Sequence, residues 1–332
     1  MTLPREIIAG RTYLVTRRTK DKLCRLRPSP VVELVTMFTL AHAAKKHGMR
    51  LLAYVVMPNH VHLVVVDPRG ELPLFCQELF GNSAKALNVA YEIGGALWDE
   101  VAYSAVWLQT PDSIYEKIAY TVLNPTAAGL VRSPEEYPGC ISRPGELGVG
   151  SIVADRPTFF FRQDEEEKAA QSARQKNLAE RGGGRPPLDA RVEIPLALPD
   201  VLPDGRSTKG REAECRRELR DVVRRGLKAI QEARHEAGLT SWIGADALRA
   251  QDPAKPPPTR GGSETAPTGA LNPRVAGRYC RWKREERVGQ PGDFWRAHAD
   301  ARISFKGGRR SVLFPAGTWQ AVRVYGARAH AA

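Results

Sequence analysis

The first 150 residues of this 332-residue chain predict an α+β domain of ferredoxin-like order, strand–helix–strand–strand–helix–strand, with one more helix at the end. Two observations predict it. Aliphatic runs typical of strands alternate with segments whose apolar residues recur at helical spacing. The two central strands are separated only by Pro58-Asn59, a pair that favours a tight turn. This βαββαβ order implies a single antiparallel sheet.

The individual elements follow from the same patterns. The expected strands cover 10–18, 51–57, 60–66 and 98–108. The expected helices cover 30–47, 72–91 and 112–123. We expect Gly48 to end the first helix, and Asp112 or Ser113 to cap the third. Pro125 should stop that third helix, because a residue before proline disfavours the helical conformation.

Beyond a domain at 1–145 the chain becomes less regular. Residues 162–208 are charged and rich in Pro and Gly, which is typical of a linker. Residues 209–332 form a basic C-terminal extension. Within it we expect an amphipathic helix at 209–238 and a flexible loop at 251–273. Aromatic residues return at 279–324 and predict a small module, or a segment that docks on the first domain.

Charge points to a polyanionic partner. The chain has 50 Lys and Arg against 37 Asp and Glu, a formal charge of +13, and nucleic acid is the usual partner of such an excess. Apolar runs stay short of a membrane span and the N-terminus lacks the pattern of a signal peptide, so we expect no membrane partner. The cysteines form no CxxC pair and are expected to be small buried side chains in a reducing cytoplasm: Cys24, Cys76, Cys140, Cys215 and Cys280.

Two histidines stand out in the second strand of the expected hairpin. His60 and His62 are two residues apart, so both imidazoles face one side of the sheet. Two convergent imidazoles are half of a divalent-metal site. The same pair is also compatible with two ordinary hydrogen-bonded histidines, and the spacing alone does not decide between these readings.

Tyr120 and Asn124 lie four residues apart at the end of the third helix, and therefore on one face. An amide oxygen is an acceptable ligand for Mg²⁺ or Mn²⁺, and a phenol beside such an ion can act as a nucleophile. Alternatively, Tyr120 packs in the core and Asn124 caps the helix. Tyr115 is a rival nucleophile on a different face of the same helix, with no polar residue four positions on.

These motifs carry a resemblance. The run from Tyr54 to Val66, with Met57-Pro-Asn-His-Val-His62 at its centre, is followed by the run from Tyr120 to Val131. Together they resemble the single-tyrosine HUH transposases, in particular the REP-associated tyrosine transposases, over about residues 5–140. The segment Phe305–Tyr325 also resembles the C-terminal extension of some long members of the family.

The resemblance implies a ferredoxin-like fold, Mg²⁺ or Mn²⁺ as cofactor, and single-stranded or hairpin DNA as substrate. It implies that His60, His62 and Asn124 bind the metal and that Tyr120 attacks the DNA, leaving a 5′-phosphotyrosine and a free 3′-OH. A second 3′-OH can then reverse the step and rejoin strands without ATP. The expected location is the cytoplasm of a bacterium, on the nucleoid, with the protein a monomer or a homodimer.

Basic residues just after the first strand are the expected DNA contacts: Arg17, Arg18, Lys20, Lys22, Arg25 and Arg27. The basic helix around 216–225 is a further candidate. Trp98, Tyr103 and Trp107 are compatible with base stacking or with core packing. The sequence departs from the family at Thr126-Ala127, where a basic residue is usual, and near Tyr103, where an Arg–aromatic pair is expected.

Two other functions fit parts of the sequence. A non-catalytic hairpin DNA- or RNA-binding protein on the same fold accounts for the charge and the long extension. A metal-dependent hydrolase of a small molecule accounts for the histidines, but it explains neither the positive charge nor the pairing of Tyr120 with Asn124.

Overall fold

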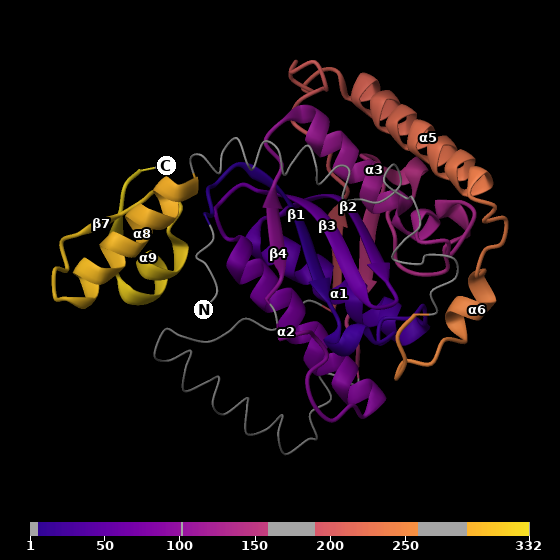
Figure 1. Ribbon diagram of the computed structural model, residues 1–332, viewed down its shortest axis with the longest axis horizontal. Helices are drawn as coiled ribbons and strands as arrows, with labels where there is room; N and C mark the ends of the chain where they lie inside the picture. The colour runs from indigo at the N-terminus through magenta and orange to yellow at the C-terminus, as the bar shows by residue number, and fades with distance from the viewer. Residues whose placement is uncertain (1–5, 101, 159–189, 258–290, 332) are drawn as a thin grey trace.

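A four-stranded antiparallel sheet lies at the centre of the computed structural model, which describes residues 6–100, 102–158, 190–257 and 291–331 (Figure 1). The strand order is β2-β3-β1-β4 and every neighbouring pair is antiparallel. This is the ferredoxin-like arrangement expected from the order of elements. The strands are β1 (Arg11–Arg18), β2 (Arg50–Met57), β3 (His60–Asp67) and β4 (Ser104–Trp107).

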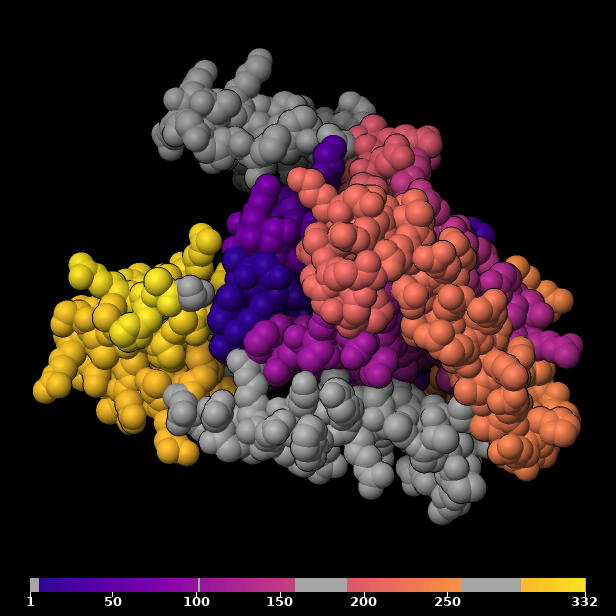
Figure 2. Space-filling model, turned by 90° about the horizontal axis from the view of Figure 1, so that it is seen from above, coloured from indigo at the N-terminus to yellow at the C-terminus, as the bar shows by residue number. Residues whose placement is uncertain are grey.

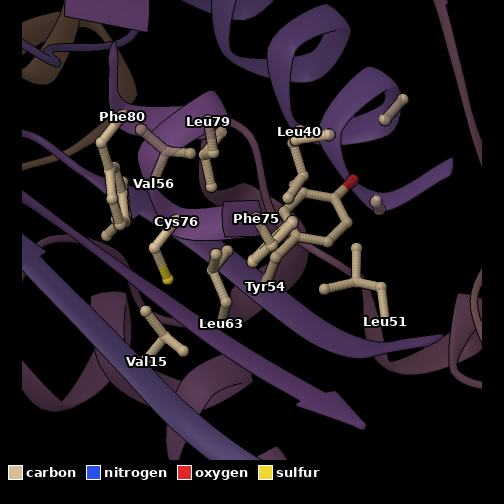
Figure 3. Close-up of a cluster of buried hydrophobic side chains, with 14 of the residues drawn as sticks. Val15, Leu40, Leu51, Tyr54, Val56, Leu63, Phe75, Cys76, Leu79 and Phe80 are labelled. Carbon is tan, nitrogen blue, oxygen red and sulfur yellow. The ribbon is translucent and has the colours of Figure 1, made fainter. Parts of the chain in front are cut away.

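One face of the sheet is covered by α1 (Pro30–His47) and α2 (Leu72–Tyr91). Ser29 caps α1 by accepting a hydrogen bond from the Val32 amide. Gly48 ends it with φ of 64°, as predicted, because glycine adopts the left-handed conformation without steric cost. Figure 3 shows this core, in which side chains of the strands and of α2 interdigitate. Its labelled members include Val15, Leu63, Phe75, Cys76 and Leu79.

The opposite face is covered by α3 (Pro111–Ala127), against which α5 (Glu212–Glu236) packs. Two predictions for α3 are wrong. Its N-cap is Thr110, which exchanges hydrogen bonds with Ser113 in a capping box. Pro125 does not end the helix but lies in its last turn, where its fixed φ is helical and only one backbone hydrogen bond is lost.

A two-stranded antiparallel sheet of β5 (Ser151–Asp155) and β6 (Arg191–Pro195) packs against α1. Ile152, Ala154, Val192 and Ile194 alternate with exposed residues and join the α1/α2 core. Residues 191–195 therefore do not belong to the linker expected at 162–208. The sequence signal was a five-residue alternation, too short to stand out beside the charged segment. The rest of that prediction falls mainly on 159–189, outside the described residues.

The C-terminal extension contains α5, which confirms the helix expected near 209–238, and a short α6 (Ala245–Arg249). It ends in a small module of α8 (Pro291–Lys306), β7 (Leu313–Phe314), α9 (Trp319–Tyr325) and β8 (Arg328–Ala329). The Ile7 amide donates to the Gly317 carbonyl at 3.0 Å, so this module docks beside the start of β1, as one of the two expectations had it.

Short 3-10 helices complete the fold at η1 (Lys20–Lys22), η2 (Pro134–Glu136) and η3 (Pro144–Glu146). In the loop expected at 251–273, the Lys255 carbonyl accepts from the Cys24 amide at 2.8 Å, while 258–273 lie outside the described residues. The four cysteines in the described part of the chain are buried and free, and Cys280 lies outside it. No helix among the described residues is both long and apolar enough to cross a membrane.

Candidate functional site

The two histidines of β3 lie on the face of the sheet that α3 covers. Val64 and Val66 follow them at two-residue spacing and pack in the α3 core, so His60 and His62 share that face. Their ring centroids are 4.8 Å apart. Across the sheet, β1 pairs Thr16 with His62 and Arg18 with His60. The expected convergence of the two imidazoles is confirmed.

Tyr120 and Asn124 reach the same place from α3. The Tyr120 hydroxyl lies 3.2 Å from His62 Nε2 within the same chain, and the two ring centroids are 5.1 Å apart. The Asn124 side chain, one turn later, lies close enough to influence the pKa of both His60 and Tyr120 through hydrogen bonding. Four side chains from one strand and one helix therefore converge, and Tyr120 also packs against the α3 core.

The far nitrogen of each imidazole has its own partner. His60 Nδ1 lies 2.6 Å from Asn59 Oδ1, and His62 Nδ1 lies 2.8 Å from Thr16 Oγ1. The Asn59 amide oxygen can only accept, so it holds the His60 proton on Nδ1 and leaves Nε2 with a lone pair. The Thr16 hydroxyl can donate or accept, so it holds the orientation of the His62 ring without fixing which nitrogen carries the proton. Sequence reasoning missed both partners. Asn59 adjoins His60 and could have been noticed, whereas Thr16 can be found only from the β1–β3 register.

Burial controls the protonation of these groups. It lowers the pKa of His60 to about 4, with the Arg18 charge acting in the same direction. It lowers the pKa of His62 well below its usual value, aided by the charge of His60 and then of Arg18. Both imidazoles are therefore neutral near pH 7, the form that binds metals. Burial raises the pKa of Tyr120 to about 12, while Asn124 and Arg18 lower it.

A buried lysine borders the site. Lys117 is only 4% exposed, and its Nζ lies 5.2 Å from the centre of the Tyr120 ring. It also contributes to the lowered pKa of His62. Sequence reasoning did not single it out, although its position three residues before Tyr120 places it on the same side of α3.

The rival side chains lie elsewhere. Tyr115 is buried and its hydroxyl lies 3.0 Å from Cys215 Sγ of α5, in the contact between the two helices. Trp98 is buried and donates from Nε1 to the Phe80 carbonyl, which favours its core role. Tyr103 and Trp107 are partly buried against the same core. The Trp107 ring lies under the Arg11 guanidinium at 3.6 Å.

The six basic residues predicted to contact DNA have different surroundings. Arg18 and Lys22 are exposed and Lys20 is half-buried. The other three donate hydrogen bonds to backbone carbonyls. Arg17 donates to Asp99, Arg25 to Ala96 and Arg27 to Arg249. Arg18 lies beside His60 on the face that carries the site, whereas Arg17 points to the other face, near the Phe80 ring.

The fold and this site define a class of protein: a ferredoxin-like domain that presents one tyrosine and one amide from a helix to an HxH pair on a strand. Residues 31–109 match the family model described as IS200-like transposase. Over that segment the chain is similar to the IS200-like transposases, which supports the resemblance to the single-tyrosine family.

Two solved structures are similar to this chain. One is a REP-associated tyrosine transposase bound to a REP hairpin, with 15% identity over 44% of this chain and 84% of that chain, and a TM-score of 0.37. The other is a protein of Deinococcus radiodurans described as a transposase, with 27% identity over 32% of this chain and 85% of that chain, and a TM-score of 0.25. The comparison with curated proteins gave no match.

Proposed function

We propose that this chain is a transposase-type endonuclease and strand transferase acting on single-stranded or hairpin DNA, with Tyr120 as its nucleophile. The observation that carries the proposal is the 3.2 Å approach of the Tyr120 hydroxyl to His62 in the same chain, with Asn124 one turn further on.

The donor set fits a divalent ion. His60 and His62 offer neutral imidazoles whose other nitrogens are already held by Asn59 and Thr16, the arrangement typical of metal-binding histidines. Asn124 adds an amide oxygen, which Mg²⁺ and Mn²⁺ accept. Bound there, such an ion would polarise the scissile phosphate and offset its developing negative charge.

The chain's own residues supply the attack. The Tyr120 oxygen forms a bond to phosphorus while the bond from phosphorus to the 3′ oxygen breaks. The phenol loses its proton and the leaving oxygen gains one, so protons balance and a 5′-phosphotyrosine remains. Because burial raises the pKa of Tyr120 to about 12, nearby positive charge is needed to favour the phenolate. The Arg18 charge lowers the pKa of Tyr120, and the Lys117 Nζ lies 5.2 Å from the centre of the Tyr120 ring.

Binding of the DNA backbone would use exposed cations on two surfaces. The first is formed by Arg18, which pairs with His60 across the sheet, and by Lys22, whose carbonyl accepts from the Asn59 side chain next to His60. The second is the outer face of α5, a ridge on the surface of the molecule in salmon to orange (Figure 2). Its exposed cations recur at helical spacing and so form one stripe, which we name the α5 stripe: Arg217, Arg220, Arg224 and Lys228.

The decisive experiment is mass spectrometry of the conjugate trapped when the full chain meets a 5′-labelled and a 3′-labelled hairpin oligonucleotide with Mn²⁺. We expect one adduct, on the peptide that contains Tyr120, joined to the 5′ phosphate of the fragment that lies 3′ of the cut and therefore carrying the 3′ label. An adduct on Tyr115 or on another residue would refute the assignment of the nucleophile. Tight hairpin binding with neither cut nor adduct would favour the non-catalytic binding protein instead.

A further inference from the structure

Asn59 makes contacts in two directions from the turn between β2 and β3. Its Nδ2 donates to the Lys22 carbonyl at 3.2 Å, and its Oδ1 lies 2.6 Å from His60 Nδ1. Its own backbone carbonyl accepts from the Thr19 amide at 2.9 Å. One residue thus joins the loop that follows β1 to an imidazole of the candidate site.

The chemistry of these partners fixes the orientation of the amide. A backbone carbonyl can only accept, so the nitrogen of the Asn59 amide must face Lys22. The oxygen therefore faces His60, and because that oxygen can only accept, the His60 proton must be on Nδ1. His60 Nε2 is then left without a proton.

The loop held at the other end is strained. Asp21 and Lys22 are consecutive non-glycine residues with φ of 55° and 56°. A left-handed conformation costs such residues on the order of 1 kcal/mol each, and it persists only where the surroundings enforce it. The Asn59 amide is one of the enforcing contacts, since it holds the carbonyl of Lys22 itself. The loop in this shape presents the exposed Lys22 near the site.

We propose that Asn59 is a positioning residue with two separable roles: its oxygen sets the tautomer of His60 for metal binding, and its nitrogen holds the basic loop 19–27 in the strained shape used for DNA. The proposal rests on the proposed function for its purpose. Its test can nevertheless be read without DNA cleavage, so the two can fail independently.

The test compares two substitutions in the full chain. Asn59→Asp keeps an oxygen for His60 but loses the donor to Lys22, whereas Asn59→Ala loses both. Asn82→Ala is the matched control, because its amide bonds to Glu78 on α2, on the far side of the sheet. The readouts are the imidazole ¹⁵N spectrum of His60 in metal-free protein, Mn²⁺ affinity by calorimetry, and hydrogen exchange of the Thr19 and Leu23 amides.

For Asn59→Asp we expect an unchanged His60 tautomer, Mn²⁺ affinity no weaker than in the unsubstituted chain, and loop exchange about tenfold faster, the effect of losing one hydrogen bond. For Asn59→Ala we expect mixed tautomers, Mn²⁺ affinity about 10–100-fold weaker, and the same faster exchange. Asn82→Ala should change none of these.

Two results would overturn the proposal. One is an Asn59→Ala protein with the original tautomer and loop exchange. The other is an Asn59→Asp protein that loses Mn²⁺ affinity as Asn59→Ala does, because the two roles would then not be separable. Should Asn59→Ala fail to fold, Asn59→Asp alone decides: slow loop exchange in that variant refutes the role of the nitrogen.

Discussion

The two faces of the central sheet are built from the same strands but differ in what they do. The face under α1 and α2 is closed by a continuous apolar core. The face under α3 is apolar only over part of its length: Val64 and Val66 lie in its core, while His60 and His62, further back along the same strand, are polar. Both faces therefore carry an apolar core, and the candidate site lies at the end of the α3 face, where polar residues replace that core.

The largest effect should separate two tyrosines of α3. Tyr120→Phe removes the hydroxyl near His62, so we expect cleavage and adduct formation to fall at least about a thousandfold, with unfolding free energy changed by no more than about 1 kcal/mol. Tyr115→Phe, the control, loses a contact with Cys215 and should cleave normally. Gel assays of labelled hairpins and urea unfolding measure the two quantities. Normal cleavage by Tyr120→Phe would show that the Tyr120 hydroxyl is not the nucleophile and that the α3 face does not carry the catalytic site.

A substitution in the α1/α2 core should have the opposite effect, a loss of stability with cleavage retained. Phe75 is fully buried there, and Phe75→Ala should lower the free energy of unfolding by about 3–5 kcal/mol through the cavity it leaves. Cleavage per folded molecule should stay within about twofold, because no side chain of the site is touched. Urea unfolding with single-turnover cleavage at low temperature tests both. A cleavage defect as large as that of Tyr120→Phe would show that the faces are not independent.

The sequence predicted the parts of the fold and site that depend on local spacing. The two-residue period places His60 and His62 on one face, and the four-residue spacing places Tyr120 and Asn124 on another, whatever the rest of the chain does. That the strand and the helix meet came from the family resemblance, because no local pattern encodes a contact between residues 58 positions apart.

The misses share a physical cause, which is dependence on long-range partners. Thr16 orients His62 only through the β1–β3 register. The carbonyl partners of Arg25 and Arg27 are also distant in sequence, while the DNA contacts of these two residues stay a prediction. The strand at 191–195 is stabilised by packing on α1, and no motif near it in the sequence predicts that contact.

Acid should lower the free energy of unfolding through the two buried histidines of the α3 face. The pKa values of His60 and His62 are lowered in the folded protein, so below pH 6.5 the unfolded chain binds protons that the folded chain does not. The free energy of unfolding should therefore fall as pH drops from about 6.5 towards 4, by at most about 1.4 kcal/mol per pH unit for each imidazole. Above pH 6.5 neither contributes. Urea unfolding across this range measures it.

The control for the acid effect is the double variant His60→Gln/His62→Gln, whose stability should depend less steeply on pH in that window. Phe75→Ala should instead run parallel to the unsubstituted protein, displaced by a constant amount, because no titrating group changes. An equally steep curve for the double variant would place the acid-sensitive groups elsewhere.

The smallest expected effect concerns DNA binding by exposed cations on the two helices α5 and α1, which lie on opposite sides of the sheet. Arg217 and Arg220 belong to the α5 stripe behind α3, whereas Lys45 and Lys46 are exposed on α1 behind the other face. If the stripe contacts phosphates, Arg217→Gln/Arg220→Gln should reduce the slope of log affinity against log salt by about two, since each lost contact releases about one counterion fewer. Lys45→Gln/Lys46→Gln removes the same charge, so fluorescence anisotropy with a hairpin should give an unchanged slope. An equal reduction of the salt slope by both double variants would mean that net charge alone attracts DNA. The α5 stripe would then make no specific contact with the DNA backbone.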